Sequence, residues 1–500
     1  MSSAAGPPPW ATHLPQGVDP EHLDLVADGS LPGRWVRRWR ERPAWAQLQD
    51  LDGRWISSLE LEERTGVVAR RLLGAGLRPG DRFILSAASS ADLVVAYVAA
   101  LRAGLVVVPL NSAYTETEIA RIVAAARPAG AAVDDARRAG WISAASRSPI
   151  LVTGVDVALP DGADAPLDRA ATGDPALLVY TSGTTGQPKG ALLTHANLLS
   201  SATAVNVAWR WQPDDRLLLA LPLFHVHGLG VGLNGSLSAG ASIVLRPKFD
   251  VDDVLARAAA GEASMFFGVP TMYQRLATCG RADSLRRLRL LVSGSAPLPA
   301  AVATAIAEAT GQIPLERYGM TETMMLTGNP CEGPRKPGTV GLPFPGVDVR
   351  LAAGGEVEVH GPNVIDGYHG NPTATAESFT ADGWFRTGDL GAFDEDGYLS
   401  LVGRSKDLII TGGYNVHPRE VEEVLLTHPA VAEAAVVGRP SPEWGEAVTA
   451  VIVASGDLDV EELRAHAASH LTGYKVPKAI ELAAELPRNA LGKVLRDRLR

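Results

Sequence analysis

One decapeptide, Thr181–Gly190, combines residue types that suit a chain of phosphates. It holds four Ser or Thr residues, three Gly and one Lys, and it follows a short apolar segment, 176–180, that is typical of a buried strand. Glycines let backbone N–H groups converge, hydroxyls add donors, and the lysine adds a cation. The pattern is not the common P-loop, because Pro188 stands where that motif needs its second Gly. Taken alone, the decapeptide fits either a polyphosphate-binding loop or a flexible surface loop.

Helical and strand patterns alternate on both sides of this decapeptide. Before it, helical spacing of apolar residues covers 59–77, 92–103 and 115–126, and strand-like runs cover 82–86 and 105–110. After it, we expect helices over 195–207, 251–260 and 299–310 and strands over 216–221, 241–245, 264–267 and 290–293. This alternation predicts an α/β protein with parallel, doubly wound sheets.

The last third of the chain has a different pattern. Short strands separated by Gly turns, over 347–351, 355–360, 384–387 and 397–402, predict a small β-rich unit. The segments 416–426, 431–437, 447–454, 460–471 and 479–482 then alternate again and predict a compact α+β domain. The polar segment Gly403–Asp407 lies between two apolar strands and is the expected boundary. We therefore expect a large N-terminal domain, residues 1–405, and a small C-terminal domain, residues 406–500.

Composition narrows the class of protein. A chain of 500 residues exceeds one ordinary core, and a net charge of −10 argues against general nucleic-acid binding. Cys279 and Cys331 cannot form a disulfide framework or a zinc site by themselves, which favours a reducing cytoplasm. The first ten residues lack the pattern of an export signal, and Arg102 interrupts the apolar run 93–110. We therefore expect a cytoplasmic protein without a membrane span.

The C-terminal end is locally basic. Residues 475–500 hold seven Lys or Arg against three Asp or Glu. A solvated terminal helix would explain part of this surplus, and an anionic ligand that arrives at this end would explain it too.

Five segments look like the motifs of one superfamily, in its order and at its spacing. They are Thr181–Gly190, 317–322, 384–389, 403–407 and 487–493. From about residue 35 to its end the chain resembles the adenylate-forming superfamily, which comprises acyl-CoA synthetases, adenylation domains and firefly-type luciferases. The resemblance implies that a carboxylate attacks the α-phosphorus of ATP, giving an acyl-adenylate and pyrophosphate, and that a thiol then attacks this anhydride. ATP, Mg²⁺ and coenzyme A would be the cofactor and co-substrates.

The resemblance assigns residues to the phosphates and the metal. Glu322 would bind Mg²⁺, a hard cation that prefers carboxylate oxygen, and Thr321 would contact the α-phosphate. The β- and γ-phosphates would be held, as they become a leaving group, by Lys189 together with Thr181, Ser182, Gly183, Thr184, Thr185 and Gly186.

The nucleoside would lie between two other segments. The resemblance places Tyr318 and Gly319 against one face of adenine, where the tyrosine ring would stack. Asp389 would accept the two ribose hydroxyls, with Arg404 behind it. The other side of the base would be covered by Gly294, Ser295 and Ala296.

The resemblance also implies a domain rotation between the two half-reactions. Lys493 would bridge the acyl carboxylate and the α-phosphate during adenylation, and the turning point would be Lys406. Rotation would then withdraw Lys493 and bring up Gly412 and Gly413, whose lack of side chains lets a thin pantetheine arm pass. Lys475 would meet the phosphates of coenzyme A.

Arg317 is the residue most informative about the acid. It neighbours Tyr318, and hence the acyl pocket, and a buried guanidinium without a partner would be costly. A second carboxylate on the substrate would satisfy it with a bidentate pair. A salt bridge to a neighbour such as Glu316 would satisfy the guanidinium equally. Lys248 is either a second cation for the second carboxylate of the substrate or a solvent-facing lysine.

Within the superfamily, several segments resemble malonyl-CoA synthetases in particular. They are 111–115, 222–229, 247–250, 293–298, 316–320 and 411–418. The implied substrate is a small dicarboxylate, malonate, with methylmalonate as a second substrate because Val226 and Met320 would leave room for a methyl group at the α-carbon. The acid would be bound by His225, Val226, Lys248, Ser293, Arg317 and Met320.

Three other interpretations remain open. The protein would be a ligase for another short or aromatic acid if Arg317 were only structural. A stand-alone amino-acid adenylation enzyme would need an acidic residue for the substrate ammonium. A silent nucleotide-binding protein would be expected to lack Lys493 or Glu322, and both are present. The sequence fits a monomer or a homodimer and does not decide between them.

Overall fold

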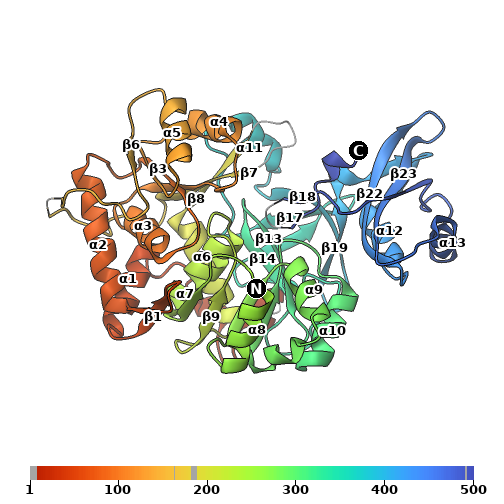
Figure 1. Ribbon diagram of the computed structural model, residues 1–500, viewed down its shortest axis with the longest axis horizontal. Coiled ribbons are helices and arrows are strands. Elements are labelled where there is room, and N and C mark those ends of the chain that lie inside the picture. The colour runs from red at the N-terminus through yellow and green to blue at the C-terminus, as the bar shows by residue number, and fades with distance from the viewer. Residues whose placement is uncertain (1–7, 163, 182–187, 490–491) are drawn as a thin grey trace, which may run out of the picture.

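Two large β-sheets and two small ones build the molecule (Figure 1). The computed structural model describes residues 8–162, 164–181, 188–489 and 492–500. The first sheet has six strands, parallel except for the last pair. Their order is β6 (Leu151–Thr153), β5 (Gly130–Val133), β3 (Arg82–Ser86), β4 (Val106–Pro109), β7 (Pro175–Thr181) and β8 (Lys189–Thr194). The helices of this region are α2 (Ser58–Gly74), α3 (Ala91–Arg102), α4 (Glu116–Ala126) and α5 (Ala136–Ala145).

The second sheet has nine strands, and its central strands are parallel. Their order is β15 (Leu342–Pro343), β14 (Met324–Gly328), β13 (Leu315–Met320), β12 (Leu290–Ser293), β11 (Met265–Gly268), β9 (Arg216–Leu219), β10 (Ser242–Leu245), β1 (Ala46–Gln49) and β2 (Trp55–Ser57). Its helices are α1 (Leu31–Glu41), α6 (His195–Ala208), the π-helix η3 (His227–Leu233), α7 (Asn234–Ala239), α8 (Val251–Ala260), α9 (Pro270–Thr278) and α10 (Ala300–Thr310). Because parallel strands end at one edge, the segments after β12 and β13 meet there.

Two small sheets follow. The first has the order β16 (Asp348–Leu351), β17 (Glu356–His360), β18 (Phe385–Phe393) and β19 (Leu399–Arg404), and α11 (Pro372–Ser378) connects its second and third strands. The second contains β21 (Tyr414–Val416), β20 (Ile409–Thr411), β23 (Gly445–Ala454), β22 (Val431–Ser441) and β24 (Ala479–Leu482), with the helices α12 (Pro418–Leu425) and α13 (Val460–His470). This last sheet stands apart from the main body in Figure 1 and packs around its own apolar core.

The predicted α/β fold with a small β-rich unit and an α+β end is confirmed. The strands expected over 82–86 and 290–293 coincide with β3 and β12, and the helix expected over 251–260 coincides with α8. The large sheets are mixed at their edges rather than wholly parallel. Lys189 was expected in the loop, but it begins β8 because it pairs with Thr181 across an antiparallel hairpin. The expected domain boundary at 403–407 covers the end of β19 and a 3₁₀ turn, and rotation about it stays a prediction.

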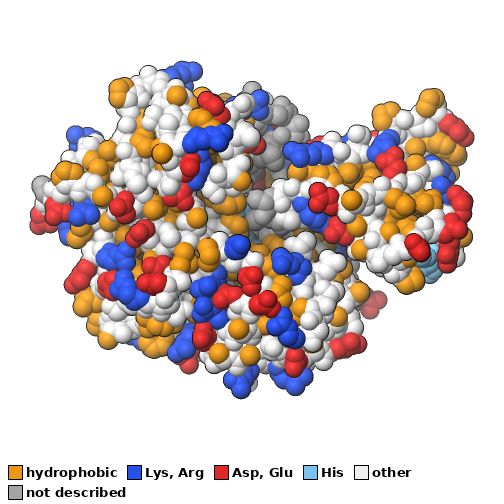
Figure 2. Space-filling model, viewed as in Figure 1, with side chains coloured by type: hydrophobic (Ala, Val, Ile, Leu, Met, Phe, Trp, Pro, Cys, Tyr) orange, Lys and Arg blue, Asp and Glu red, His pale blue; other side chains and the backbone are white. Residues whose placement is uncertain are grey.

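On the face shown in Figure 2, Lys and Arg side chains are interspersed with Asp and Glu and form no single extended basic patch. Among the described residues, no helix is long and apolar enough to cross a membrane. One extensive apolar cluster includes residues of both large sheets and of α3, which is buried along almost its whole length.

Candidate active site

The decapeptide predicted to bind phosphates joins two antiparallel strands. Thr181 ends β7 and Lys189 begins β8, and these two residues pair with each other. The Thr181 hydroxyl donates to Oε1 of Glu322 at 3.3 Å. Five of the residues assigned to the phosphates, Ser182, Gly183, Thr184, Thr185 and Gly186, lie outside the described residues. The hairpin thus places Thr181 beside the carboxylate expected to bind Mg²⁺.

A tyrosine that sequence reasoning missed completes this corner. The Tyr368 hydroxyl donates to Oε1 of Glu322 at 3.1 Å, and Lys189 Nζ lies 5.3 Å from the centre of the Tyr368 ring. Burial and the neighbouring Glu322 carboxylate raise the pKa of Tyr368, so its hydroxyl keeps its proton and remains a donor. The sequence offered one signal for Tyr368, which is an aromatic hydroxyl in a loop flanked by Gly367 and Gly370.

The surroundings of Glu322 fit a divalent cation. Its side chain is buried, and within the described parts of the chain no Lys, Arg or His forms an ion pair with it. Two hydroxyls, from Thr181 and Tyr368, orient one carboxylate oxygen. A buried carboxylate held by neutral donors is suited to a hard cation such as Mg²⁺.

Tyr368→Phe should raise the Mg²⁺ concentration needed for half-maximal activity about tenfold. The variant loses a hydrogen bond to a charged group, which is worth about 1.5–3 kcal/mol. ATP–pyrophosphate exchange measured over a range of Mg²⁺ concentrations would show the shift. Tyr398→Phe is the matched control, because that hydroxyl donates to the Pro334 carbonyl instead. An unchanged Mg²⁺ requirement in Tyr368→Phe would contradict the role of this tyrosine.

Asp389 is the centre of the expected nucleoside site. Its Oδ1 lies 2.9 Å from Arg404 Nε, as the resemblance implied, and its Oδ2 accepts a hydrogen bond of 2.6 Å from the Tyr318 hydroxyl, which was not predicted. Burial and the Asp389 carboxylate raise the pKa of Tyr318 well above its usual value. This bond holds the hydroxyl end of the tyrosine ring in place beside Asp389.

The two segments predicted to contact adenine, 294–296 and 318–319, have little room for other residue types or conformations. Ser295 has φ +74°, a left-handed conformation that non-glycine residues rarely adopt, and such strain clusters at functional sites. Gly319 lies so close to the Met324 carbonyl that any side chain would overlap it. Gly294 is buried, while Ser295 and Ala296 are half-buried. The backbone of the residues predicted to contact adenine is therefore closely constrained by its neighbours.

Lys493 reaches this site from the C-terminal sheet domain. The residue before it, Gly492, abuts Thr271 of α9, where an added Cβ would lie 2.9 Å from the threonine hydroxyl. Burial, with the charges of Arg404 and Lys406, lowers the pKa of Lys493 to about 8. Among residues with described positions, none forms an ion pair with its ammonium group. Lys493 is thus an unpaired cation beside Asp389 and Arg404.

The lowered pKa of Lys493 predicts how adenylation depends on pH. The ammonium form is the one that can neutralise charge, and it is lost as the pH rises through about 8. The kcat/KM for adenylate formation should therefore fall on the alkaline side with a midpoint near pH 8. Lys493→Arg should shift this limb beyond pH 9, since a guanidinium stays charged there. The same midpoint in both enzymes would contradict the assignment.

Arg317 lies on β13 at the opposite end of the site from solvent. Its side chain is 4% exposed, and Nε and Nη2 are buried without a hydrogen-bond partner in the described structure. Burial lowers the pKa of Arg317 to about 9. The alternative partner, Glu316, points to the other face of the strand, where it accepts a hydrogen bond of 3.0 Å from the Leu298 amide. A salt bridge from Arg317 to Glu316 is therefore absent.

Further residues of the predicted acid pocket surround Arg317. Burial, together with the charges of Arg317 and Lys493, lowers the pKa of His225 to about 3, so this imidazole is neutral and lies near both cations. Its Nδ1 accepts a hydrogen bond of 3.2 Å from the His227 amide, which leaves its proton on Nε2. Ser293 is buried with its hydroxyl unpartnered among the described residues, Val226 is buried, and Met320 is partly buried.

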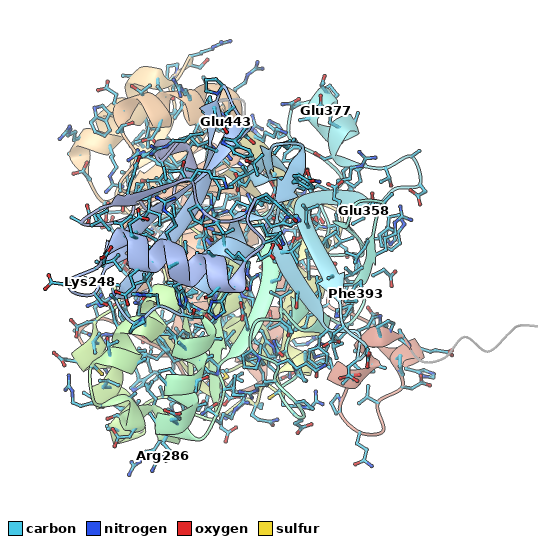
Figure 3. The ribbon with its side chains drawn as sticks, turned by 90° about the vertical axis from the view of Figure 1, so that its right-hand side faces the viewer. Lys248, Arg286, Glu358, Glu377, Phe393 and Glu443 are labelled. Atoms are coloured by element: carbon cyan, nitrogen blue, oxygen red, sulfur yellow. The ribbon has the colours of Figure 1, made fainter. Side chains whose placement is uncertain are left out.

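The structure does not bring Lys248 to the predicted acid pocket. Lys248 is exposed and lies at the outer edge of the molecule in Figure 3. It follows β10, which is four strands away from β13, and at the usual strand spacing these two strands are about 19 Å apart. This arrangement gives no support to an acid shared by Lys248 and Arg317.

The residues predicted for coenzyme A lie away from the nucleoside site in this arrangement. Gly412 and Gly413, at φ +56° and +84°, form the exposed turn between β20 and β21. Lys475 pairs with Glu420 at 2.5 Å, so it is not a free cation here. Lys406 is exposed in the 3₁₀ turn after β19. With Lys493 at the site and this turn outside it, the geometry suits adenylation rather than thiol transfer.

Comparison with known proteins places the chain in a family. The family model described as AMP-binding enzyme matches residues 33–369, and the model of the AMP-binding enzyme C-terminal domain matches residues 420–493. A feruloyl-CoA synthase of Amycolatopsis sp is 38% identical over 94% of this chain and 98% of its own. A malonate–CoA ligase of Arabidopsis thaliana is 36% identical over 89% of this chain and 82% of its own.

A solved structure gives the same result for the fold. The crystal structure of ATP-bound MatB from Rhodopseudomonas palustris is 39% identical to this chain, with a TM-score of 0.88, and the match covers 94% of this chain and 98% of that one. Both the sequence motifs and their arrangement in space are therefore shared over nearly the whole molecule. The chain belongs to the adenylate-forming family of AMP-binding enzymes.

Proposed function

We propose that this enzyme ligates malonate, and also methylmalonate, to coenzyme A through an acyl-adenylate, with release of AMP and pyrophosphate. Relatives that match most of this chain are acid–CoA ligases, and MatB was solved with ATP bound. The observation that carries the choice of acid is the buried Arg317 guanidinium, which lacks a protein partner within the described residues. The similarity to a malonate–CoA ligase and to MatB supports it.

The second carboxylate of the acid would supply the hydrogen-bond partner that the Arg317 guanidinium lacks among the described residues. Pairing with an anion compensates the burial of the guanidinium, and a bidentate pair also fixes the orientation of the acid. Held at that end, a three-carbon diacid would direct its other carboxylate past His225 toward Lys493, because His225 lies within the fields of both cations. Arg317 thus anchors the acid, and Lys493 meets its reacting end.

The remaining residues act on ATP. Tyr318, held by Asp389, would stack on adenine, and Thr321 and the hairpin with Lys189 would hold the phosphates. Mg²⁺ bound by Glu322 would supply charge neutralisation on the phosphate oxygens. Lys493 adds positive charge where the acyl oxygen and the α-phosphate meet, which lowers the electrostatic barrier to attack. Rotation of the C-terminal domain about Lys406 would then withdraw Lys493 from the site and bring Gly412 and Gly413 to it. The thiol of coenzyme A would enter next to these glycines.

The second candidate is an aromatic acid. A small apolar cavity, with room for about one water molecule, is lined by Leu223 and Phe224 together with residues of α3, β3, β4 and η3. Phe224 adjoins His225 of the predicted acid pocket, but the cavity itself does not hold an aromatic ring. The similarity to a feruloyl-CoA synthase agrees with such a substrate. This candidate leaves Arg317 without a partner, which is why we rank it second.

An amino-acid substrate is disfavoured by the charges at the site. An ammonium group needs a nearby carboxylate, yet the described groups around the acid pocket are Arg317, Lys493 and neutral histidines. The adjacent carboxylate, that of Glu316, faces away.

A substrate panel tests the proposed function. The purified enzyme would be given ATP, Mg²⁺ and coenzyme A with equal concentrations of malonate, methylmalonate, acetate, benzoate and ferulate, and the thioesters would be identified by mass. We expect malonyl-CoA to form fastest and methylmalonyl-CoA next. Faster formation of acetyl-CoA would contradict the proposal. Faster formation of benzoyl-CoA or feruloyl-CoA would contradict it and support the aromatic alternative.

A further inference from the structure

We propose that His227 is a second specificity-determining residue, a neutral imidazole whose Nε2–H donates to the distal carboxylate of the acid beside Arg317. This inference rests on the proposed function and adds a donor that the family motifs do not assign. His227 is the first residue of the π-helix η3, in the segment that also supplies His225.

The contacts of His227 leave one ring nitrogen free. The side chain is 1% exposed, and its Nδ1 lies 3.1 Å from the Ser295 hydroxyl. Its Nε2 is buried and has no hydrogen-bond partner among the residues whose positions are described. Buried polar atoms are nearly always hydrogen-bonded, so an unpartnered one beside a substrate pocket indicates a group supplied by the ligand.

The same short segment positions both His227 and Arg317. Ser295 holds the imidazole, and the residue before it, Gly294, lies against the guanidinium so closely that any Cβ there would overlap it. Ser293, the next residue back, adds a buried hydroxyl without a partner in the described structure. Unpartnered polar atoms of Ser293, His227 and Arg317 are therefore gathered around three consecutive residues at the end of β12.

The surroundings keep His227 uncharged. Burial, followed by the charges of Arg317 and His225, holds the pKa of His227 well below its ordinary value. When the Ser295 hydroxyl donates to Nδ1, the proton of the neutral ring must be on Nε2, which makes this atom a donor. One cation and one neutral donor then face one carboxylate, which balances the charge without burying a second unpaired cation.

Two donors from different directions would also fix the plane of the carboxylate. Arg317 approaches from β13, and His227 approaches from η3. A monocarboxylic acid of the same length, propionate, would leave both donors unpaired in a buried site. Such a site rejects an analogue that lacks the hydrogen-bonding group much more strongly than an apolar pocket rejects a change in size.

The test compares malonate with propionate in three enzymes: the wild type, His227→Phe and His227→Gln. We expect His227→Phe to lower kcat/KM for malonate about 10- to 100-fold, with a loss for propionate at least tenfold smaller. His227→Gln, whose amide can still donate, should recover most of the malonate activity. The Kd for ATP, measured for each variant, reports whether the neighbouring nucleoside site remains folded.

The outcomes separate this inference from the proposed function. A wild type that prefers propionate would overturn both. A wild type that prefers malonate, with a preference that is undiminished in His227→Phe, would overturn only the role of His227. Equal losses for the two acids, or no recovery in His227→Gln, would also overturn it, because a merely structural residue affects both acids alike.

Discussion

Lys493→Ala should slow acyl-adenylate formation by about 10²- to 10³-fold, the usual effect of removing one electrostatic contact to a transition state. The ammonium group of Lys493 is an unpaired cation beside Asp389 and Arg404, and its removal takes away positive charge where the acid meets the α-phosphate. A supplied acyl-adenylate should still react with coenzyme A at close to the wild-type rate. The reason is that thiol attack is expected after the C-terminal domain has turned and withdrawn this residue.

Single-turnover measurements would separate the two steps. Adenylation would be followed by ATP–pyrophosphate exchange, and thioester formation would be started from synthetic acyl-adenylate. Lys248→Ala is the matched control, because this lysine is exposed at the outer edge of the molecule (Figure 3) and should change neither step. Equal losses of both steps in Lys493→Ala would contradict the division between the two domain arrangements.

Arg317→Ala should raise KM for malonate by an amount equivalent to about 2–5 kcal/mol, the usual cost of truncating one partner of a buried charge pair. The effect on propionate should be much smaller, since that acid has no second carboxylate for the guanidinium. Arg317→Lys should recover only part of the loss, because an ammonium group cannot form the bidentate pair.

Steady-state kinetics with both acids would check this prediction. Arg286→Ala is a suitable control, because Arg286 lies on the surface in Figure 3 and donates to the Ala309 carbonyl at 2.9 Å. If Arg317→Ala impaired malonate and propionate equally, Arg317 would be a structural residue. The aromatic-acid alternative would then become the better proposal.

Much of this architecture follows from local sequence patterns. Strands buried on both faces appear as continuous apolar runs, and helices such as α4 begin at a clear capping residue, Thr115, so the alternation of elements was predictable. The resemblance to the motifs of the adenylate-forming superfamily was equally informative about the nucleotide, because it pointed to Glu322, Asp389 and Lys493. The structure brings Glu322 to the β7–β8 hairpin and Lys493 to the neighbourhood of Asp389.

Contacts between distant segments were not predictable. Tyr368 meets Glu322 across 46 residues, and Tyr318 meets Asp389 across 71, although no local pattern connects either pair. Lys248 shows the opposite case, because a motif-like neighbourhood suggested a role that the strand order does not support. The position of a residue in a sheet depends on how strands are ordered, and a single sequence gives little information on that order.

The central claim is that a buried guanidinium selects a second negative charge on the acid. The most direct measurement compares kcat/KM for malonate and for its monoamide, which has nearly the same shape but a neutral amide at the distal end. The unpartnered Nε and Nη2 of Arg317 predict that malonate is preferred at least 30-fold, a ratio equivalent to about 2 kcal/mol. Equal use of the two acids would contradict the claim.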